Sequence, residues 1–156
     1  MKLKEGDRAP EIVLPDQDGV EQKLSDFNGQ WVLVYFYPKD DTPGCTKEAC
    51  TIRDDFHNFE KLDLKVFGIS TDSVKSHKKF AEKYKLPFTL LADEGNKTVE
   101  DYGVWVEKKF MGHTYMGTTR TSFLIDPKGN IKKIYENVKP VVHAEQILAD
   151  LKLFIK

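Results

Sequence analysis

The chain has 156 residues, 40% of them hydrophobic and 31% charged, and its formal net charge at pH 7 is −1. A chain of this length can bury a core without disulfide staples, so we expect one domain over residues 1–156. The near-neutral charge argues against nucleic acid or an anionic membrane as the main partner. No apolar stretch approaches the ~20 residues of a membrane span, and the N-terminus lacks an apolar core of signal-peptide length. We therefore expect a cytoplasmic protein.

The first third of the chain predicts a hairpin followed by a buried strand. Asp18-Gly19 lies between the segments at residues 12–14 and 20–24, and this pattern is typical of a β-hairpin. A single helical turn should follow the hairpin. Residues 31–37 are apolar without alternation, which indicates a central strand covered on both faces.

A helix is expected directly after Thr42. The hydroxyl of Thr42 can cap the helix, and Pro43 suits the first helical position because its missing N–H would be unpaired there anyway. Apolar side chains then recur at spacings of four and three residues, at Ile52, Phe56 and Phe59. One face of this helix should therefore be buried.

The rest of the chain alternates between strands and helices before a second hairpin. The expected elements are a strand at 64–70, a helix at 73–84, a short strand at 88–91, a small helix ending at 102, strands at 121–125 and 131–135, and a C-terminal amphipathic helix. Residues 103–119 are expected to form an irregular excursion with strand edges. This order predicts an α/β fold with a thioredoxin-like layout: a central mixed β-sheet flanked by helices, with an N-terminal β-hairpin extension.

Both cysteines of the chain lie within residues 38–50. With Thr42 as the N-cap, Cys45 occupies the third helical position, where unpaired amides and the positive end of the helix dipole favour a thiolate. Gly44 lets the backbone approach a ligand without a Cβ in the way. These features suit a nucleophilic cysteine whose substrate oxygens are held by hydrogen-bond donors.

The spacing between Cys45 and Cys50 restricts what the two thiols can do together. On an intact helix, residues five apart have Cα atoms roughly 8–9 Å from each other and about 140° apart around the axis. A disulfide needs a Cα separation of about 4.4–6.8 Å. The two can therefore bond only if the first turns of the helix unwind, which fits a sulfenic acid that condenses with a resolving thiol. The simpler interpretation is that both are small buried hydrophobes, as most cytosolic cysteines are.

The sequence gives little reason to expect a metal or another cofactor. Two cysteines cannot supply the four ligands of a structural zinc site unless histidines join them. The histidines are scattered, at His57, His77, His113 and His143, and none has the spacing of a ligand pair. Those at 57, 77 and 143 lie on or near expected helices, where a solvent-facing position is the default. We expect no metal and no cofactor.

The segment around Cys45 carries a family motif. The pattern P-x-x-x-T-x-x-C, which begins at Pro38, resembles the active-site signature of the peroxiredoxins. The fuller run T-P-G-C-T-K-E-A-C resembles the peroxiredoxin Q branch, also called bacterioferritin comigratory protein. Further motifs of this branch follow in order through nearly the whole chain, from G-D-R-A-P at residues 6–10 to R-T-S-F-L-I-D at residues 120–126.

The resemblance implies a thioredoxin fold and the reduction of hydrogen peroxide and organic hydroperoxides to water and alcohols. It makes Cys45 the peroxidatic cysteine and Cys50 the resolving one, which form an intramolecular disulfide after local unwinding. It implies that Thr42 bonds the peroxide and that Arg120 holds the thiolate and the substrate oxygens. Pro38 would shield the pocket. Thioredoxin or a similar dithiol would be the reductant, and the chain would act as a monomer.

Two further pocket residues, Gly44 and Glu48, follow from the same motif. Glu48 matches a position typical of the branch and is expected to bond Arg120. Without the motif, Glu48 is expected on the helix surface and Arg120 as a surface charge before a strand. An arginine beside Cys45 would favour the thiolate and stabilise the charge that develops on the leaving oxygen.

Other function classes compete with a peroxidase. A disulfide reductase of the thioredoxin type would need C-x-x-C at the helix start, and the four-residue gap here counts against it. A redox-switched binding module is permitted by the same helix geometry. A cysteine hydrolase with one of the histidines as base is weaker, because it leaves Cys50 and Thr42 without a task.

Overall fold

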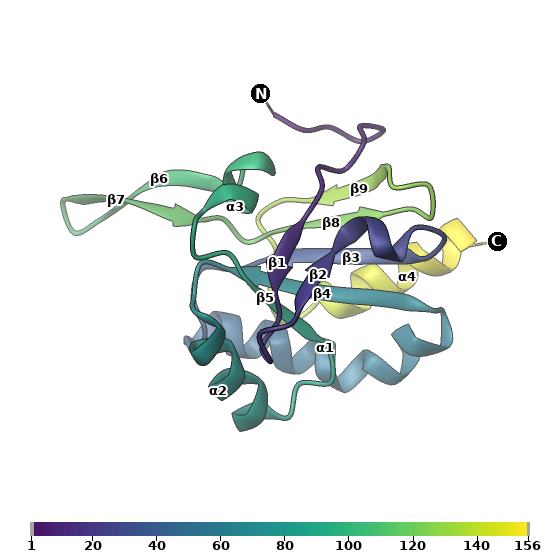
Figure 1. The fold of residues 1–156 in the computed structure, drawn as a ribbon, viewed down its shortest axis with the longest axis horizontal. Helices are drawn as coiled ribbons and strands as arrows, with labels where there is room; N and C mark the ends of the chain where they lie inside the picture. Colours follow the sequence, from purple (N-terminus) through teal and green to yellow (C-terminus); the bar gives the residue numbers. More distant parts are fainter. Residues whose placement is uncertain (1, 156) are drawn as a thin grey trace.

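The computed structural model describes residues 2–155, and its centre is a five-stranded sheet in the order β5-β4-β3-β8-β9 (Figure 1). The strands are β3 (Trp31–Phe36), β4 (Leu64–Ser70), β5 (Thr89–Ala92), β8 (Thr121–Ile125) and β9 (Ile131–Tyr135). Pairing is parallel from β3 through β4 to β5, and antiparallel from β3 through β8 to β9. The sheet is therefore mixed, as the sequence predicts.

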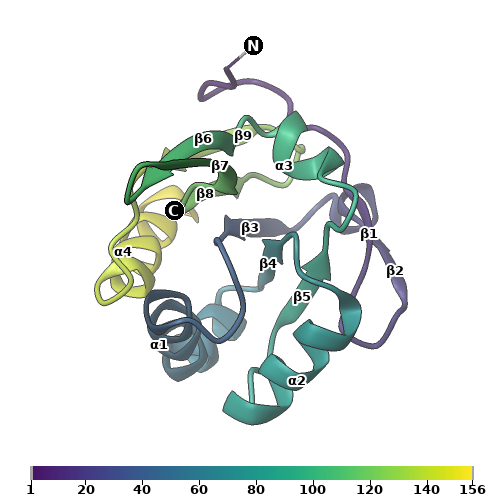
Figure 2. The ribbon, with the colours of Figure 1, turned by 90° about the vertical axis from the view of Figure 1, so that its left-hand side faces the viewer.

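Helices cover one face of the sheet, and smaller elements cover the other (Figure 2). The helical face carries α1 (Pro43–Lys61), α2 (Val74–Tyr84) and α4 (His143–Ile155). The opposite face carries the hairpin β1 (Val13–Pro15) and β2 (Glu21–Lys23), the 3-10 turn η1 (Leu24–Phe27) and the short helix α3 (Lys97–Asp101). This arrangement confirms the predicted thioredoxin-like layout with its N-terminal hairpin.

Strand β3 contributes side chains to both cores. Leu33 and Tyr35 pack among the residues of α1, α2 and α4, whereas Val34 and Phe36 pack against the N-terminal segment and α3. Successive side chains of a strand point to opposite faces, so a strand enclosed on both sides needs apolar residues at every position. The uninterrupted apolar run at residues 31–37 thus places β3 at the centre of the fold.

Residues 103–119 are more regular than the sequence predicts. They contain a two-stranded antiparallel hairpin, β6 (Trp105–Phe110) and β7 (His113–Thr118), which projects from the body of the molecule (Figure 1). Its turn is Met111-Gly112, and both residues have positive φ values, 50° and 80°. Because its outer residues face solvent, the hairpin lacks the apolar alternation by which a half-buried strand is recognised.

The helix boundaries follow the predicted caps. Helix α1 begins at Pro43 with Thr42 at the N-cap position, and α2 begins after Ser73, whose side chain accepts a hydrogen bond from the backbone N–H of Ser76. Within residues 2–155, no helix is both long enough and apolar enough to cross a membrane.

Candidate active site

Cys45 lies in the first turn of α1, directly after the loop that leaves β3. It occupies the third helical position, as predicted, and is only 2% exposed. The predicted capping hydrogen bond of Thr42 is not formed. The Thr42 hydroxyl instead donates to the backbone carbonyl of Lys39 at 2.9 Å. Its proton is therefore engaged, and its oxygen lone pairs can still accept a hydrogen bond.

Arg120 joins the two buried polar groups of this turn. Its Nη2 donates to Cys45 Sγ at 3.3 Å, and its Nη1 donates to Glu48 Oε1 at 2.8 Å. The backbone of Arg120 is itself fixed, because its carbonyl accepts from the N–H of Val138 at 3.0 Å. The structure thus brings together three residues that the family motif predicts, across more than 70 positions of sequence.

Gly44 makes room for the guanidinium group. A Cβ built on Gly44 would lie 3.0 Å from Arg120 Nη2, closer than an ordinary van der Waals contact. The sequence interpretation has Gly44 admit a ligand to the backbone; in the structure, the group that comes close is Arg120. A side chain at this position would push the guanidinium away from Cys45 or displace the helix start.

Glu48 is fully buried, contrary to the surface position expected from sequence alone. Its Oε2 has no hydrogen-bond partner within residues 2–155. Burial raises the pKa of Glu48 from its ordinary 4.5 to about 7, although the charge and hydrogen bond of Arg120 oppose the rise. Burial also works against the charge of Arg120, but its neighbours Cys45 and Glu48 raise the pKa of the guanidinium above its ordinary value. A permanent cation therefore faces one carboxyl group that titrates near neutrality.

Cys50 lies on the same unbroken helix as Cys45, and both thiols are free. Cys50 is half-buried. Helical geometry places their Cα atoms roughly 8–9 Å apart, beyond the range of a disulfide. Next to Cys50, the Thr51 hydroxyl shares its proton between the carbonyls of Glu48 at 2.9 Å and Pro140 at 3.0 Å, and the second contact ties α1 to the loop before α4. The helix seen here is thus the form in which the two cysteines cannot bond.

Two histidines predicted to face solvent are buried instead. His77 and His143 are each 0% exposed. His143 Nε2 lies 2.8 Å from Ser122 Oγ, its Nδ1 has no partner among residues 2–155, and burial lowers the pKa of His143 to about 4. His57 is exposed on α1, as predicted, and His113 is exposed on the projecting hairpin.

His77 belongs to a cluster that the sequence does not indicate. Potential metal-ligand atoms of Asp40, Asp72 and His77 all lie within 4.8 Å of one another. However, His77 Nδ1 and Asp40 Oδ2 already bond each other at 2.7 Å, and Asp72 Oδ2 already accepts from the backbone N–H of Asp40. These groups satisfy each other as they stand.

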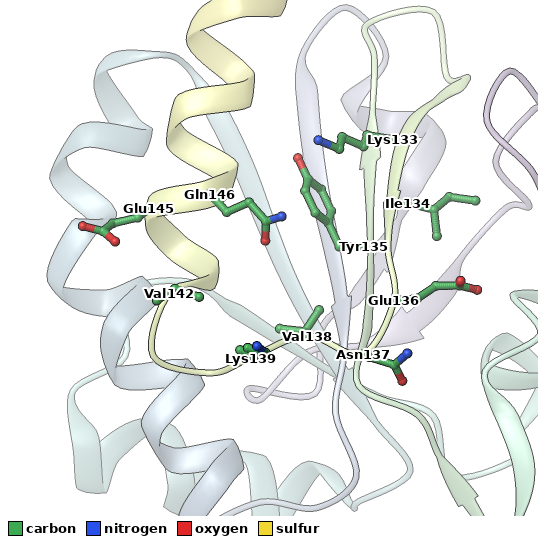
Figure 3. Close-up of a pocket in the computed structure, with 10 residues that line it drawn as sticks. All are labelled: Lys133, Ile134, Tyr135, Glu136, Asn137, Val138, Lys139, Val142, Glu145 and Gln146. Atoms are coloured by element: carbon green, nitrogen blue, oxygen red, sulfur yellow. The ribbon is translucent and has the colours of Figure 1, made fainter.

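A cavity of about 680 Å³ lies between β9, the loop after it and the start of α4 (Figure 3). Figure 3 shows Tyr135 and Gln146 pointing into this space. None of the predicted catalytic residues lines it. Pro38, in the loop that follows β3, is half-buried, and its shielding of the cysteine site stays a prediction.

Comparison with known proteins shows a family match and full-length relatives. The model of the AhpC/TSA family matches residues 5–134. Peroxiredoxin Bcp of Escherichia coli strain K12 is 51% identical over 150 residues, which cover 96% of this chain and 96% of that protein.

Solved structures of similar proteins also superpose closely on this chain. A structure that addresses the alkyl peroxide reduction activity of Xanthomonas campestris bacterioferritin comigratory protein superposes with a TM-score of 0.88 at 35% identity, covering 93% of this chain and 92% of that one. A mutant PrxQ of Xylella fastidiosa gives a TM-score of 0.94 at 32% identity, covering 100% of this chain and 99% of that one.

Proposed function

This chain belongs to the AhpC/TSA family and is a thiol peroxidase of the peroxiredoxin Q, or bacterioferritin comigratory protein, branch, and we propose that Cys45 is its peroxidatic cysteine and Cys50 its resolving cysteine. The observation that carries this assignment is the 3.3 Å contact from Arg120 Nη2 to Cys45 Sγ in the first turn of α1. A fixed cation beside the sulfur stabilises the thiolate, which is the form that attacks a peroxide.

The first step is displacement at the O–O bond of a hydroperoxide. The Cys45 thiolate attacks the terminal oxygen, a bond forms between sulfur and that oxygen, and the O–O bond breaks. The sulfur is oxidised to a sulfenic acid. The leaving oxygen takes a proton from solvent and departs as an alcohol, or as water when the substrate is hydrogen peroxide.

Two residues would orient the peroxide in this step. The Thr42 hydroxyl donates its proton to the carbonyl of Lys39, so its oxygen can accept the O–H of the substrate. Arg120 carries several N–H donors, and those not aimed at Cys45 or Glu48 can bond the oxygen on which negative charge develops. Pro38 would shield this pocket from water, and Gly44 leaves room for the guanidinium.

The second step joins the two cysteines. After the first turns of α1 unwind, the Cys50 thiolate attacks the sulfur of the Cys45 sulfenic acid. The S–O bond breaks, and the hydroxide takes up a proton and leaves as water. The need to unwind follows from the helical separation of the two Cα atoms, which is beyond disulfide range.

A dithiol donor then reduces the Cys45–Cys50 disulfide by exchange, and the donor leaves as its own disulfide. We propose thioredoxin as this donor and the cytosol as the compartment, because the cycle needs a continuous supply of reduced dithiol. We also propose that the monomer is active and that residues 1–156 form one domain. Cys45, Cys50, Glu48 and Arg120 all come from a single chain, which supports this proposal.

Stopped-flow oxidation of the reduced protein by hydrogen peroxide tests the two roles. Cys45→Ser should abolish fast peroxide consumption. Cys50→Ser should react once and then stall as a sulfenic acid, which a dimedone probe captures at Cys45. Far-UV circular dichroism of both variants controls for folding. Turnover by Cys45→Ser at the wild-type rate would overturn the assignment, and so would repeated turnover by Cys50→Ser with thioredoxin as the only donor.

A further inference from the structure

A buried set of polar side chains surrounds Asp40, two residues before the N-cap of α1. Asp40 is 7% exposed, and its carboxylate has three partners. Oδ1 accepts from the Tyr37 hydroxyl at 2.5 Å, and Oδ2 accepts from the Ser76 hydroxyl at 2.8 Å. Oδ2 also lies 2.7 Å from His77 Nδ1. The catalytic steps described above use none of these groups.

The contacts of His77 require a proton between it and Asp40. His77 Nε2 lies 2.8 Å from the carbonyl oxygen of Leu91, which can only accept, so Nε2 must carry a hydrogen. A neutral imidazole protonated at Nε2 has a lone pair at Nδ1. Two lone pairs 2.7 Å apart would repel each other, so the pair holds one further proton, on either Nδ1 or the carboxyl group. Asp40 and His77 are thus joined by a buried hydrogen bond.

The backbone of Asp40 is held as well. Its N–H donates to Asp72 Oδ2 at 2.8 Å, and the same oxygen accepts from the Ser70 hydroxyl at 2.6 Å. Through these contacts, the loop before α1 is tied to the end of β4, to α2 and, by way of His77, to β5. Downstream of the cysteines, α1 is tied again where Thr51 bonds the carbonyl of Pro140. The stretch that must unwind therefore lies between two fixed points.

We propose that Asp40 and His77 are positioning residues that hold the loop before α1 in place while the helix start opens and re-forms. The proposal rests on the proposed function, because it presumes that Cys45 and Cys50 form a disulfide in each cycle. A segment whose upstream end is fixed loses less entropy on re-forming its helix than one whose end is free. We call the Asp40–His77 contact the anchor. Without it, the equilibrium between the helical and the unwound form of this segment shifts toward the unwound form, in which Cys45 has left Arg120.

The two chemical steps should therefore respond differently to loss of the anchor. We expect Asp40→Ala to slow oxidation of Cys45 by peroxide about tenfold, while the subsequent formation of the disulfide is unchanged or faster. Asp40→Asn should retain most of the wild-type rate, because its amide N–H can donate to neutral His77 and its oxygen can accept from Tyr37. The control is Asp18→Asn, which alters an exposed carboxylate that bonds Lys78 of α2 but lies outside the loop before α1, and it should react at the wild-type rate.

Stopped-flow tryptophan fluorescence after mixing with hydrogen peroxide measures the two phases separately. A wild-type oxidation rate in Asp40→Ala would overturn the proposal. Equal slowing of both phases would also overturn it, because that result indicates general loss of structure. So would an Asp40→Asn variant as slow as Asp40→Ala. If Cys45→Ser is inactive while Asp40→Ala matches the wild type, the anchor fails and the peroxidase assignment stands.

A spectroscopic test on the wild-type protein does not depend on how the variants fold. The Nε2–H of His77 is buried and bonded to Leu91, so it should give a slowly exchanging imidazole signal in a ¹H–¹⁵N NMR spectrum. We expect this signal to persist when the protein is converted to its disulfide form. The control is Cys50→Ser, which cannot form the disulfide. Loss of the signal in the wild type on oxidation, but not in Cys50→Ser, would show that the anchor opens with the helix and would overturn the proposal.

Discussion

Replacing Glu48 by Gln should change how the stability of the reduced protein depends on pH. Burial raises the pKa of Glu48 from 4.5 to about 7. Because this pKa is higher in the folded than in the unfolded state, the folded protein binds more protons between these values. The contribution of Glu48 to the free energy of unfolding is therefore fully present below pH 4.5 and is lost as the pH rises through 7. At ~1.4 kcal/mol per pKa unit, the loss amounts to about 3 kcal/mol.

The glutamine of the Glu48→Gln variant would have an amide oxygen that can still accept from Arg120 Nη1, but no group that titrates. The free energy of unfolding of Glu48→Gln should therefore gain about 3 kcal/mol relative to the wild type between about pH 4.5 and pH 8. Urea unfolding at a series of pH values measures this difference. Glu60→Gln, an exposed position on the same helix, is the matched control and should show no such trend. A difference that stays constant across the pH range would refute the reasoning.

Two more predictions concern Gly44 and His143. Gly44→Ala should slow oxidation of Cys45 by peroxide about tenfold, because the new Cβ displaces Arg120 Nη2 and weakens a charged hydrogen bond worth ~1.5–3 kcal/mol. The control is Gly95→Ala, where a Cβ meets nothing within 4 Å, and it should react at the wild-type rate. Equal rates for both variants would contradict the role of Gly44. Burial lowers the pKa of His143 from 6.5 to about 4, so the unfolded state binds more protons below pH 6.5 and stability falls as the pH drops toward 4. Between pH 6.5 and pH 4, the free energy of unfolding of His143→Gln, measured with urea, should fall by about 3 kcal/mol less than that of the wild type. An equal fall in both proteins would contradict the prediction.

Much of the fold can be predicted because the signals are local. The apolar run of β3, the Pro43 start of α1 and the Ser73 cap of α2 each depend on a few neighbouring residues. The exposed hairpin β6–β7 escapes prediction because residues such as Phe110 face solvent and carry no burial pattern. Its turn at Met111-Gly112 is the available signal.

Prediction of the site depends on the family motif, because its residues are far apart in the sequence and come together only in the folded chain. Nothing in the local sequence places Arg120 beside Cys45; only the motif singles it out, and the match to the family supports that motif. Burial of Glu48 can be inferred, because it lies four residues before Ile52 on the inward face of α1. His77 likewise lies three residues before Phe80 on the buried side of α2. A polar side chain is expected to be exposed by default, but here Arg120 offsets part of the cost of burying Glu48, and Asp40 does the same for His77.

The central claim is that Cys45 reacts from an intact helix turn and reaches Cys50 only after that turn unwinds. Amide hydrogen exchange of the reduced protein and of the disulfide form, prepared with one equivalent of hydrogen peroxide, tests it most directly. We predict faster exchange over roughly residues 42–50 in the disulfide form and unchanged protection in β3 and β4. Unchanged exchange over residues 42–50, with a Cys45–Cys50 disulfide verified by mass spectrometry, would contradict it.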